Sequence, residues 1–139
     1  MKKFELTTET KINIFGKKLF RIKALISFGF IHAGEEGGWV EKEENLSQSG
    51  DAWVSGNAEV FGDAEVFGNA DYTTIHGFGT RFRTTTFFRC KDKKIRVSCG
   101  CFFGTISEFK EQVKRTRDGK VAEEYLMIAD LMEKHFKEE

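Results

Sequence analysis

Residues 77–89, which read GFGTRFRTTTFFR, carry side chains suited to holding a phosphorylated, nucleotide-like anion. Guanidinium groups form forked hydrogen bonds with phosphate oxygens, and phenylalanine rings stack on bases. The stretch is not a P-loop, because no GKS or GKT follows its glycines. The residues expected to bind the ligand are Arg81, Phe82, Arg83, Thr85 and Arg89.

Two other interpretations of this stretch stay open. It could be an ordinary amphipathic strand whose threonines and arginines face the solvent. It could also bind a nucleic acid. In an extended strand, successive side chains point to opposite faces. Arg81, Arg83 and Thr85 would then share one face, and Phe82 the other. We give the arginine face more weight, because one ligand reaches both faces only where the strand twists or two subunits meet.

The histidines and cysteines do not form a catalytic or metal-binding pattern. His76 follows the repeat described below and His32 precedes it, and no Asp or Glu stands at a spacing that would orient either ring. Cys99 and Cys101 form a lone CxC with Cys90 at a distance, whereas zinc sites usually pair CxxC-type motifs. We therefore expect buried thiols, no metal, no cofactor and no catalytic residue.

A six-residue motif is repeated back to back just before this stretch: GDAWVS, GNAEVF, GDAEVF and GNADYT, over residues 50–73. A fixed period sets the architecture ahead of any single residue. Alanine recurs at one phase and valine or tyrosine two residues later, so both should point to one interior. Glycine followed by Asp or Asn suits a corner. The residues expected to be buried are Ala52, Val54, Ala58, Val60, Ala64, Val66 and Ala70.

This repeat resembles the hexapeptide repeat of left-handed parallel β-helices. In that family three hexads form one triangular coil, so about eighteen residues make a turn. The resemblance implies that Val54 stacks on Tyr72, and that the array extends back through Val40 and Leu46. Roughly two coils make a thin core, which needs caps or another chain.

Phe61 and Phe67 follow two of the repeat valines, so alternation turns both rings outward. Outward rings on a thin core should be covered by another surface, either the C-terminal helices or a second protomer. We expect a homo-oligomer with Phe61 and Phe67 in its contact.

The segments flanking the repeat predict hairpins and helices. Residues 11–28 indicate a β-hairpin that turns at FGKK, and residues 84–103 indicate another that turns at KDKK. Thr105 and Glu108 form the capping box of a helix, and a second helix is expected from about Lys120 to Lys137. The predicted fold is mainly β with C-terminal α: a short left-handed parallel β-helix flanked by β-hairpins and ending in an αα-hairpin.

Three parts are expected along the chain. Residues 1–36 form an N-terminal β-hairpin and cap, residues 37–75 the hexapeptide-repeat β-helix, and residues 76–139 a β-hairpin with a two-helix module. The segment CGCFFGTISEFKEQV, with EYLMIADLMEKHF after it, is similar to a module found after pentapeptide or hexapeptide repeats in phage-related proteins. That similarity covers about residues 84–136 and implies a phage or prophage origin without supplying catalytic residues.

Charge is distributed unevenly although the formal net charge is +0. Residues 35–71 carry 10 acidic and 1 basic side chain, and residues 81–121 carry 12 basic and 4 acidic. Such blocks pair within one fold or select a charged partner. No apolar run reaches membrane-spanning length, the N-terminus does not read as a signal peptide, and the odd cysteine count indicates a reducing cytosol. We expect a cytoplasmic protein, in the host cytoplasm if it is phage-encoded, with no membrane partner.

These features predict a non-catalytic, phage-type binding protein. By analogy, it would act against host defence, either by sequestering a nucleotide-like phosphorylated small molecule or by blocking a host protein. Two alternatives stay open: a small hexapeptide-repeat acyltransferase, and an acidic nucleic-acid mimic that uses residues 35–71. The expected partners are further copies of the chain and an anionic small molecule or a host protein, with nucleic acid ranked after them.

Overall fold

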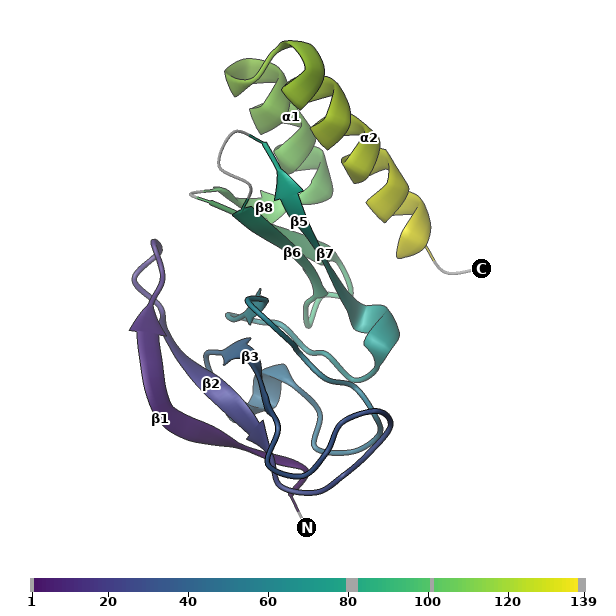
Figure 1. The fold of residues 1–139 in the computed structure, drawn as a ribbon. Helices are drawn as coiled ribbons and strands as arrows, with labels where there is room; N and C mark the ends of the chain where they lie inside the picture. The colour runs from purple at the N-terminus through teal and green to yellow at the C-terminus, as the bar shows by residue number, and fades with distance from the viewer. Residues whose placement is uncertain (1, 80–82, 101, 138–139) are drawn as a thin grey trace.

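The computed structural model describes residues 2–79, 83–100 and 102–137. Within them, two four-stranded sheets follow one another along the chain, and two helices complete the fold (Figure 1). The first sheet consists of β1 (Phe4–Ile12), β2 (Lys18–Ala24), β3 (Glu36–Val40) and β4 (Glu59–Val60), in that order. The second consists of β5 (Tyr72–Phe78), β6 (Arg83–Arg89), β7 (Ile95–Cys99) and β8 (Phe102–Thr105), also in that order.

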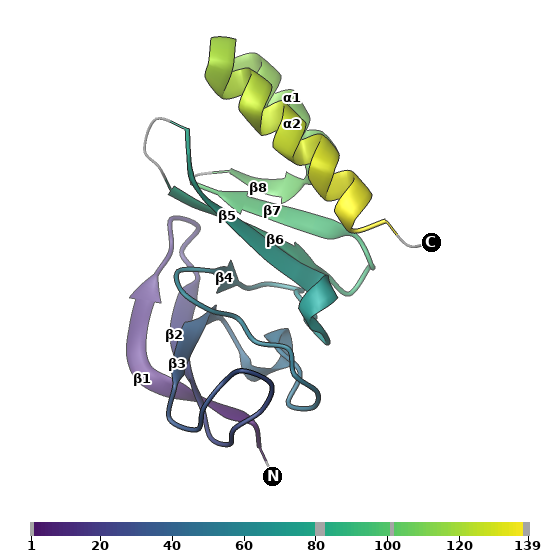
Figure 2. The same ribbon diagram turned by 45° about the vertical axis from the view of Figure 1, so that its right-hand side comes forward.

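The helices α1 (Ile106–Thr116) and α2 (Gly119–His135) lie on the face of the second sheet that is turned away from the first (Figure 2). They form a separate buried cluster there with Phe87 and Val97. Neither of these two described helices is long and apolar enough to cross a lipid bilayer.

The prediction of a left-handed parallel β-helix is wrong. The ladders of the second sheet are antiparallel, as are β1–β2 and β2–β3. In the described residues, parallel pairing is confined to β3–β4 and to one bridge between Leu46 and Val66. Tyr72, which was expected to stack on Val54, instead pairs with Phe88 in the β5–β6 ladder.

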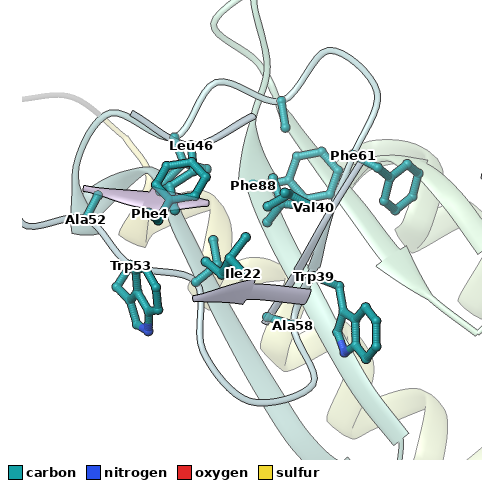
Figure 3. Close-up of a cluster of buried hydrophobic side chains, with 14 of the residues drawn as sticks. Phe4, Ile22, Trp39, Val40, Leu46, Ala52, Trp53, Ala58, Phe61 and Phe88 are labelled. Carbon is teal, nitrogen blue, oxygen red and sulfur yellow. The ribbon is translucent and has the colours of Figure 1, made fainter. Parts of the chain in front are cut away.

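The repeat, residues 50–73, runs mostly as an irregular loop, and the N-terminal hairpin supplies further side chains to the core that this loop surrounds. Phe4, Leu19 and Ile22 are fully buried and pack in one cluster with the repeat valines. Figure 3 labels Phe4 and Ile22 in this cluster together with Ala52 and Ala58 of the repeat. A stack of roughly two coils would leave its ends open. The β1–β2 hairpin closes one side of the loop, and Phe88 and Cys90 from the second sheet close another.

The prediction that the alanines and valines of the repeat are buried is confirmed in the first three units and is wrong for the alanine of the fourth. The alanines and valines from Ala52 to Val66 are all buried, whereas Ala70 is exposed. The fourth unit departs because residues Asn69–Asp71 form a 3-10 turn that leads into β5. Accordingly, Gly50, Gly56 and Gly62 have φ of +74°, +60° and +65°, whereas Gly68 has an extended φ of −147°.

Both predicted hairpins and the helix pair are confirmed, with shifted bounds. The first hairpin begins earlier than expected, at Phe4, and turns at residues 13–17, where Asn13 Oδ1 accepts from the backbone N–H groups of Phe15 and Lys17. The capping box of α1 is present: Glu108 N donates to Thr105 Oγ1 at 3.1 Å, and Thr105 N donates to Glu108 Oε1 at 2.8 Å.

The division of the chain into three parts stays a prediction. Strands β3 and β4 belong to the same sheet as the N-terminal hairpin, so the strands between Phe4 and Val60 share one sheet, and their buried residues share one core. The second sheet begins at Tyr72, before residue 76. Lys3 also ties the N-terminus to the repeat, because its buried Nζ donates to the carbonyl of Ala52 at 2.7 Å.

Candidate functional site

The structure describes the side chains of two residues of the predicted ligand set, Thr85 and Arg89. Arg81 and Phe82 lie outside the described residues, as does the side chain of Arg83. Thr85 is buried on β6, where its hydroxyl donates to Cys99 Sγ at 3.2 Å. Its neighbour on the same face, Phe87, packs against α1, so this face of the strand is the one that the helices cover.

Arg89 is held by contacts within the chain. Its Nε lies 3.0 Å from Asp71 Oδ1, its Nη1 donates to the carbonyl of Lys93 at 3.0 Å, and its guanidinium carbon lies 5.9 Å from the ring centre of Phe136. Arg89 and Phe67 line a hollow of about 420 Å³ at the end of α2, which we call the helix-end pocket. The structure therefore brings together one predicted ligand residue and one predicted contact residue.

Phe61 does not point outward as predicted. It is 2% exposed, because the second sheet packs over it, and its ring contacts those of Phe15, Phe88 and Phe103. Alternation fails here because the chain leaves the extended strand after Val60: β4 covers Glu59–Val60 alone, and the next strand, β5, begins at Tyr72. Phe67 is 58% exposed, so the predicted contact between copies now depends on Phe67.

The opposite face of β6 looks toward the first sheet, and two hollows open there. The larger, which we call the polar cleft, measures about 530 Å³. The other, which we call the aromatic-basic pocket, measures about 480 Å³. Phe15, in the turn of the N-terminal hairpin, lines both. Figures 1 and 2 show this turn reaching up to the second sheet.

Three phenylalanine rings, of Phe15, Phe61 and Phe103, line the aromatic-basic pocket, and the buried ring of Phe88 packs against two of them. The ring of Phe15 stacks on that of Phe61, with centroids 6.0 Å apart and planes at 29°. Phe103 lies 5.0 Å from Phe61 and 5.9 Å from Phe15, and Phe88 lies beneath it at 6.2 Å. Phe15 and Phe103 remain partly exposed, whereas Phe61 and Phe88 are buried.

Basic side chains form the other side of this pocket. Arg96 Nη2 donates to Asp92 Oδ2 at 2.7 Å, and that hydrogen bond raises the pKa of the guanidinium. Arg96 Nη1 is covered and has no hydrogen-bond partner among the described residues. Lys17 and Lys91 complete the basic lining.

Cys90 also lines the aromatic-basic pocket but is not suited to nucleophilic chemistry. Burial raises the pKa of its thiol to about 11, so the thiol stays protonated near neutral pH. Because the thiolate is the reactive form of cysteine, this thiol is a weak nucleophile near neutral pH.

The polar cleft brings together groups from both sheets. His76 Nδ1 and Thr84 Oγ1 lie 2.9 Å apart on neighbouring strands. Lys11 Nζ of β1 lies 2.8 Å from Glu59 Oε2 of β4, so this ion pair joins the two outer strands of the first sheet. Among the residues that the structure describes, the ring of His76 contacts the hydroxyl of Thr84 and no carboxylate.

Three of the ten carboxylates of the acidic segment pair with lysines near the N-terminus. Glu41, Glu43 and Glu59 form ion pairs with Lys17, Lys2 and Lys11, respectively. Of the ion pairs among described residues, Asp71–Arg89 is the one that joins the acidic segment to the basic segment.

Comparison with known protein families finds no match for this chain, and comparison with curated proteins finds no significant relative. The resemblance to phage-related repeat proteins therefore stays a prediction. Across residues 2–79, 83–100 and 102–137, no group of three or more His, Cys, Asp or Glu side chains is placed to hold a metal ion.

The residues that line the aromatic-basic pocket were missed at the sequence level, although two signals pointed toward them. Lys91 and Arg96 lie in the segment with a large excess of basic side chains. Arg96 also alternates with the apolar Ile95 and Val97 on a predicted strand, which marks it as a residue of the other face. Nothing in the sequence around Phe15 indicated a place in the pocket, because its position there depends on the contact of the hairpin turn with the second sheet.

Proposed function

We propose that this protein is a non-catalytic binding protein that sequesters a nucleotide-like phosphorylated small molecule in the aromatic-basic pocket. The observation that carries the proposal is Arg96, whose guanidinium is fixed by Asp92 through one nitrogen while Nη1 has no acceptor among the described residues. A covered N–H without an acceptor is costly. An oxygen of a bound phosphate would provide that acceptor after a small shift of the side chain.

The rings of the pocket support an aromatic group on the same ligand. Phe15 and Phe103 lie at the mouth and are partly exposed, whereas Phe61 and Phe88 behind them are buried and fix the position of both. Base-on-ring stacking contributes roughly 1–3 kcal/mol per base. A ligand with a base at the rings and a phosphate at Arg96 would use both sides of the pocket.

The aromatic-basic pocket is lined by three basic and two acidic side chains, a balance that favours an anion of low charge. Lys91 has no ion pair among the described residues, and Lys17 is only loosely paired with Glu41 at 3.9 Å. Asp63 also lines the pocket, and its carboxylate would accept hydrogen bonds from an amino group or a hydroxyl. In a phage or prophage, removal of such a molecule from solution would act against host defence.

Isothermal titration calorimetry with the full chain tests the proposal. The probes are nucleoside mono-, di- and triphosphates, the corresponding nucleosides, and inorganic phosphate. We expect nucleotides to bind more tightly than either nucleosides or phosphate. Arg96→Gln should weaken nucleotide binding by roughly tenfold or more, because a charge-assisted hydrogen bond contributes about 1.5–3 kcal/mol.

The matched control is Arg117→Gln, which removes the same charge from an exposed position at the C-terminal end of α1. It should leave both binding and melting temperature nearly unchanged. Absence of binding to every nucleotide would reject the proposal, and equal affinity for phosphate and nucleotides would reject the role of the rings. Equal loss in the two variants would show that only overall charge matters.

A further inference from the structure

The polar cleft has two unlike walls. On one side lie His76, Thr84, Thr86 and Ser98 of β5, β6 and β7, of which Thr86 and Ser98 are mostly covered, with 2% and 9% exposed. On the other, the hairpin turn presents Ile12 and Ile14, which are 72% and 69% exposed, and Phe15 beside them. One wall therefore offers hydrogen bonds, and the other offers apolar surface.

The polar wall follows from strand register. His76 is paired across from Thr84, and Thr86 across from Ser98, so these four side chains occupy adjoining positions of the sheet. Hydroxyl groups both donate and accept, and the imidazole of a neutral histidine does the same. Such a surface suits a ligand whose own groups are hydroxyls, because either partner can supply the proton.

The charges at the cleft are compensated. Lys11 is paired with Glu59 at 2.8 Å, and the ammonium also lies 4.5 Å from the ring centre of Trp39. The lining thus differs from that of the aromatic-basic pocket, where Lys91 has no ion pair among the described residues. This balance favours an uncharged ligand over a phosphate.

The side-chain amide of Asn13 is a second, independent indication that the polar cleft holds a ligand or an ordered water. Its Oδ1 accepts from the backbone N–H groups of Phe15 and Lys17, both at 3.0 Å, which fixes the orientation of the amide. Its Nδ2 is covered and has no acceptor among the described residues, although Asn13 lines the cleft. Buried amide donors are normally satisfied, so an acceptor from a ligand or an ordered water is expected there.

We propose that the polar cleft is a second binding site, for an uncharged ligand built on a sugar ring. The hydroxyls of the ring would meet the side chains of β5, β6 and β7, and its C–H face would cover Ile12 and Ile14. A free sugar and the ribose of a nucleoside share this chemistry. The site is separate from the proposed nucleotide pocket and would operate whether or not that pocket binds an anion.

Titration of the ¹⁵N-labelled full chain with D-glucose, D-ribose and uridine, followed by NMR, tests the proposal. We expect at least one of these probes to shift the amide signals of His76, Thr84 and Thr86, together with the side-chain amide of Asn13. Binding of glucose would identify a free sugar as the source, and binding of uridine alone would identify a nucleoside. Failure of all three probes to shift these signals at millimolar concentration would overturn the proposal.

Two variants separate this site from the aromatic-basic pocket. Asn13→Asp keeps the acceptor that holds the turn but removes the Nδ2 donor, so it should weaken binding of the uncharged probe roughly tenfold. Arg96→Gln should leave that binding unchanged. If Arg96→Gln abolishes it and Asn13→Asp does not, the probe occupies the other pocket and the proposal fails.

Discussion

Replacement of Phe61 by alanine should destabilise the protein strongly. The side chain is 2% exposed, and its ring centroid lies 6.0 Å from that of Phe15, 5.6 Å from Phe88 and 5.0 Å from Phe103. Truncation of a buried phenylalanine removes its transfer free energy and leaves a cavity, which together cost about 3–5 kcal/mol. The cavity would lie between the two sheets, where residues of both meet.

Phe67→Ala is the matched control, because Phe67 stands at the same position of the next repeat unit and is 58% exposed. Its cost in a monomer should stay within about 0.5 kcal/mol. Urea unfolding followed by the fluorescence of Trp39 and Trp53, both buried in the core around the repeat, measures the two effects. Equal small effects would show that Phe61 is not covered by the second sheet.

Light scattering on the same two proteins tests the predicted homo-oligomer. A contact that uses Phe67 would dissociate on Phe67→Ala at a protein concentration where the wild type stays associated. A wild-type protein that is monomeric at all concentrations would contradict the contact.

Three further changes probe other parts of the fold. Gly38→Ala should cost about 1–3 kcal/mol in urea unfolding, because its Cβ would lie 2.8 Å from the carbonyl oxygen of Ala58, whereas Gly68→Ala, with open space and an extended φ, should be nearly neutral. Thr105→Ala should cost about 1 kcal/mol through loss of the helix cap, measured by thermal unfolding; no change would contradict the capping role. Burial raises the pKa of Cys90 from 9.0 to about 11, so the stability from its protonated thiol is present below pH 9 and is lost as the pH rises toward 11. The wild type should therefore lose about 2–3 kcal/mol more than Cys90→Ala over that pH range, and parallel pH profiles would refute the shift.

Local features were predictable from the sequence. The box formed by Thr105 and Glu108 involves residues three apart, so its chemistry is decided within one helical turn. The turn at residues 91–94 and the strands on either side of it depend on short-range pairing in the same way. The inward phase of the repeat up to Val66 also followed from alternation alone.

The arrangement of the repeat was not predictable by the same means. Period and phase restrict which side chains face inward, but they do not decide whether a loop stacks on itself or on another part of the chain. Here the N-terminal hairpin provides Phe4, Leu19 and Ile22 to the same core, a contact between segments far apart in sequence. Phe61 was misplaced for the same reason, since the residues that bury it, Phe15 and Phe103, belong to distant turns and strands.

The candidate site shows the same limit. Strand alternation correctly separated Thr85 from Thr84 and Thr86, but it could not tell which face of β6 the helices would cover. The helices cover the face of Thr85, so the open hollows lie on the other face. The arginine that best fits an anion in the described structure is Arg96, one strand away from the predicted set.

The most direct test of the proposed nucleotide pocket is the NMR signal of the Arg96 side-chain Nε–H group during titration with nucleoside monophosphates. We expect this signal and the ring protons of Phe103 to shift together and to saturate at the same nucleotide concentration. The side-chain signal of Arg117, on the helix layer, should stay in place. Saturable shifts confined to other arginines, or the absence of any shift at Arg96, would contradict a nucleotide site in the aromatic-basic pocket.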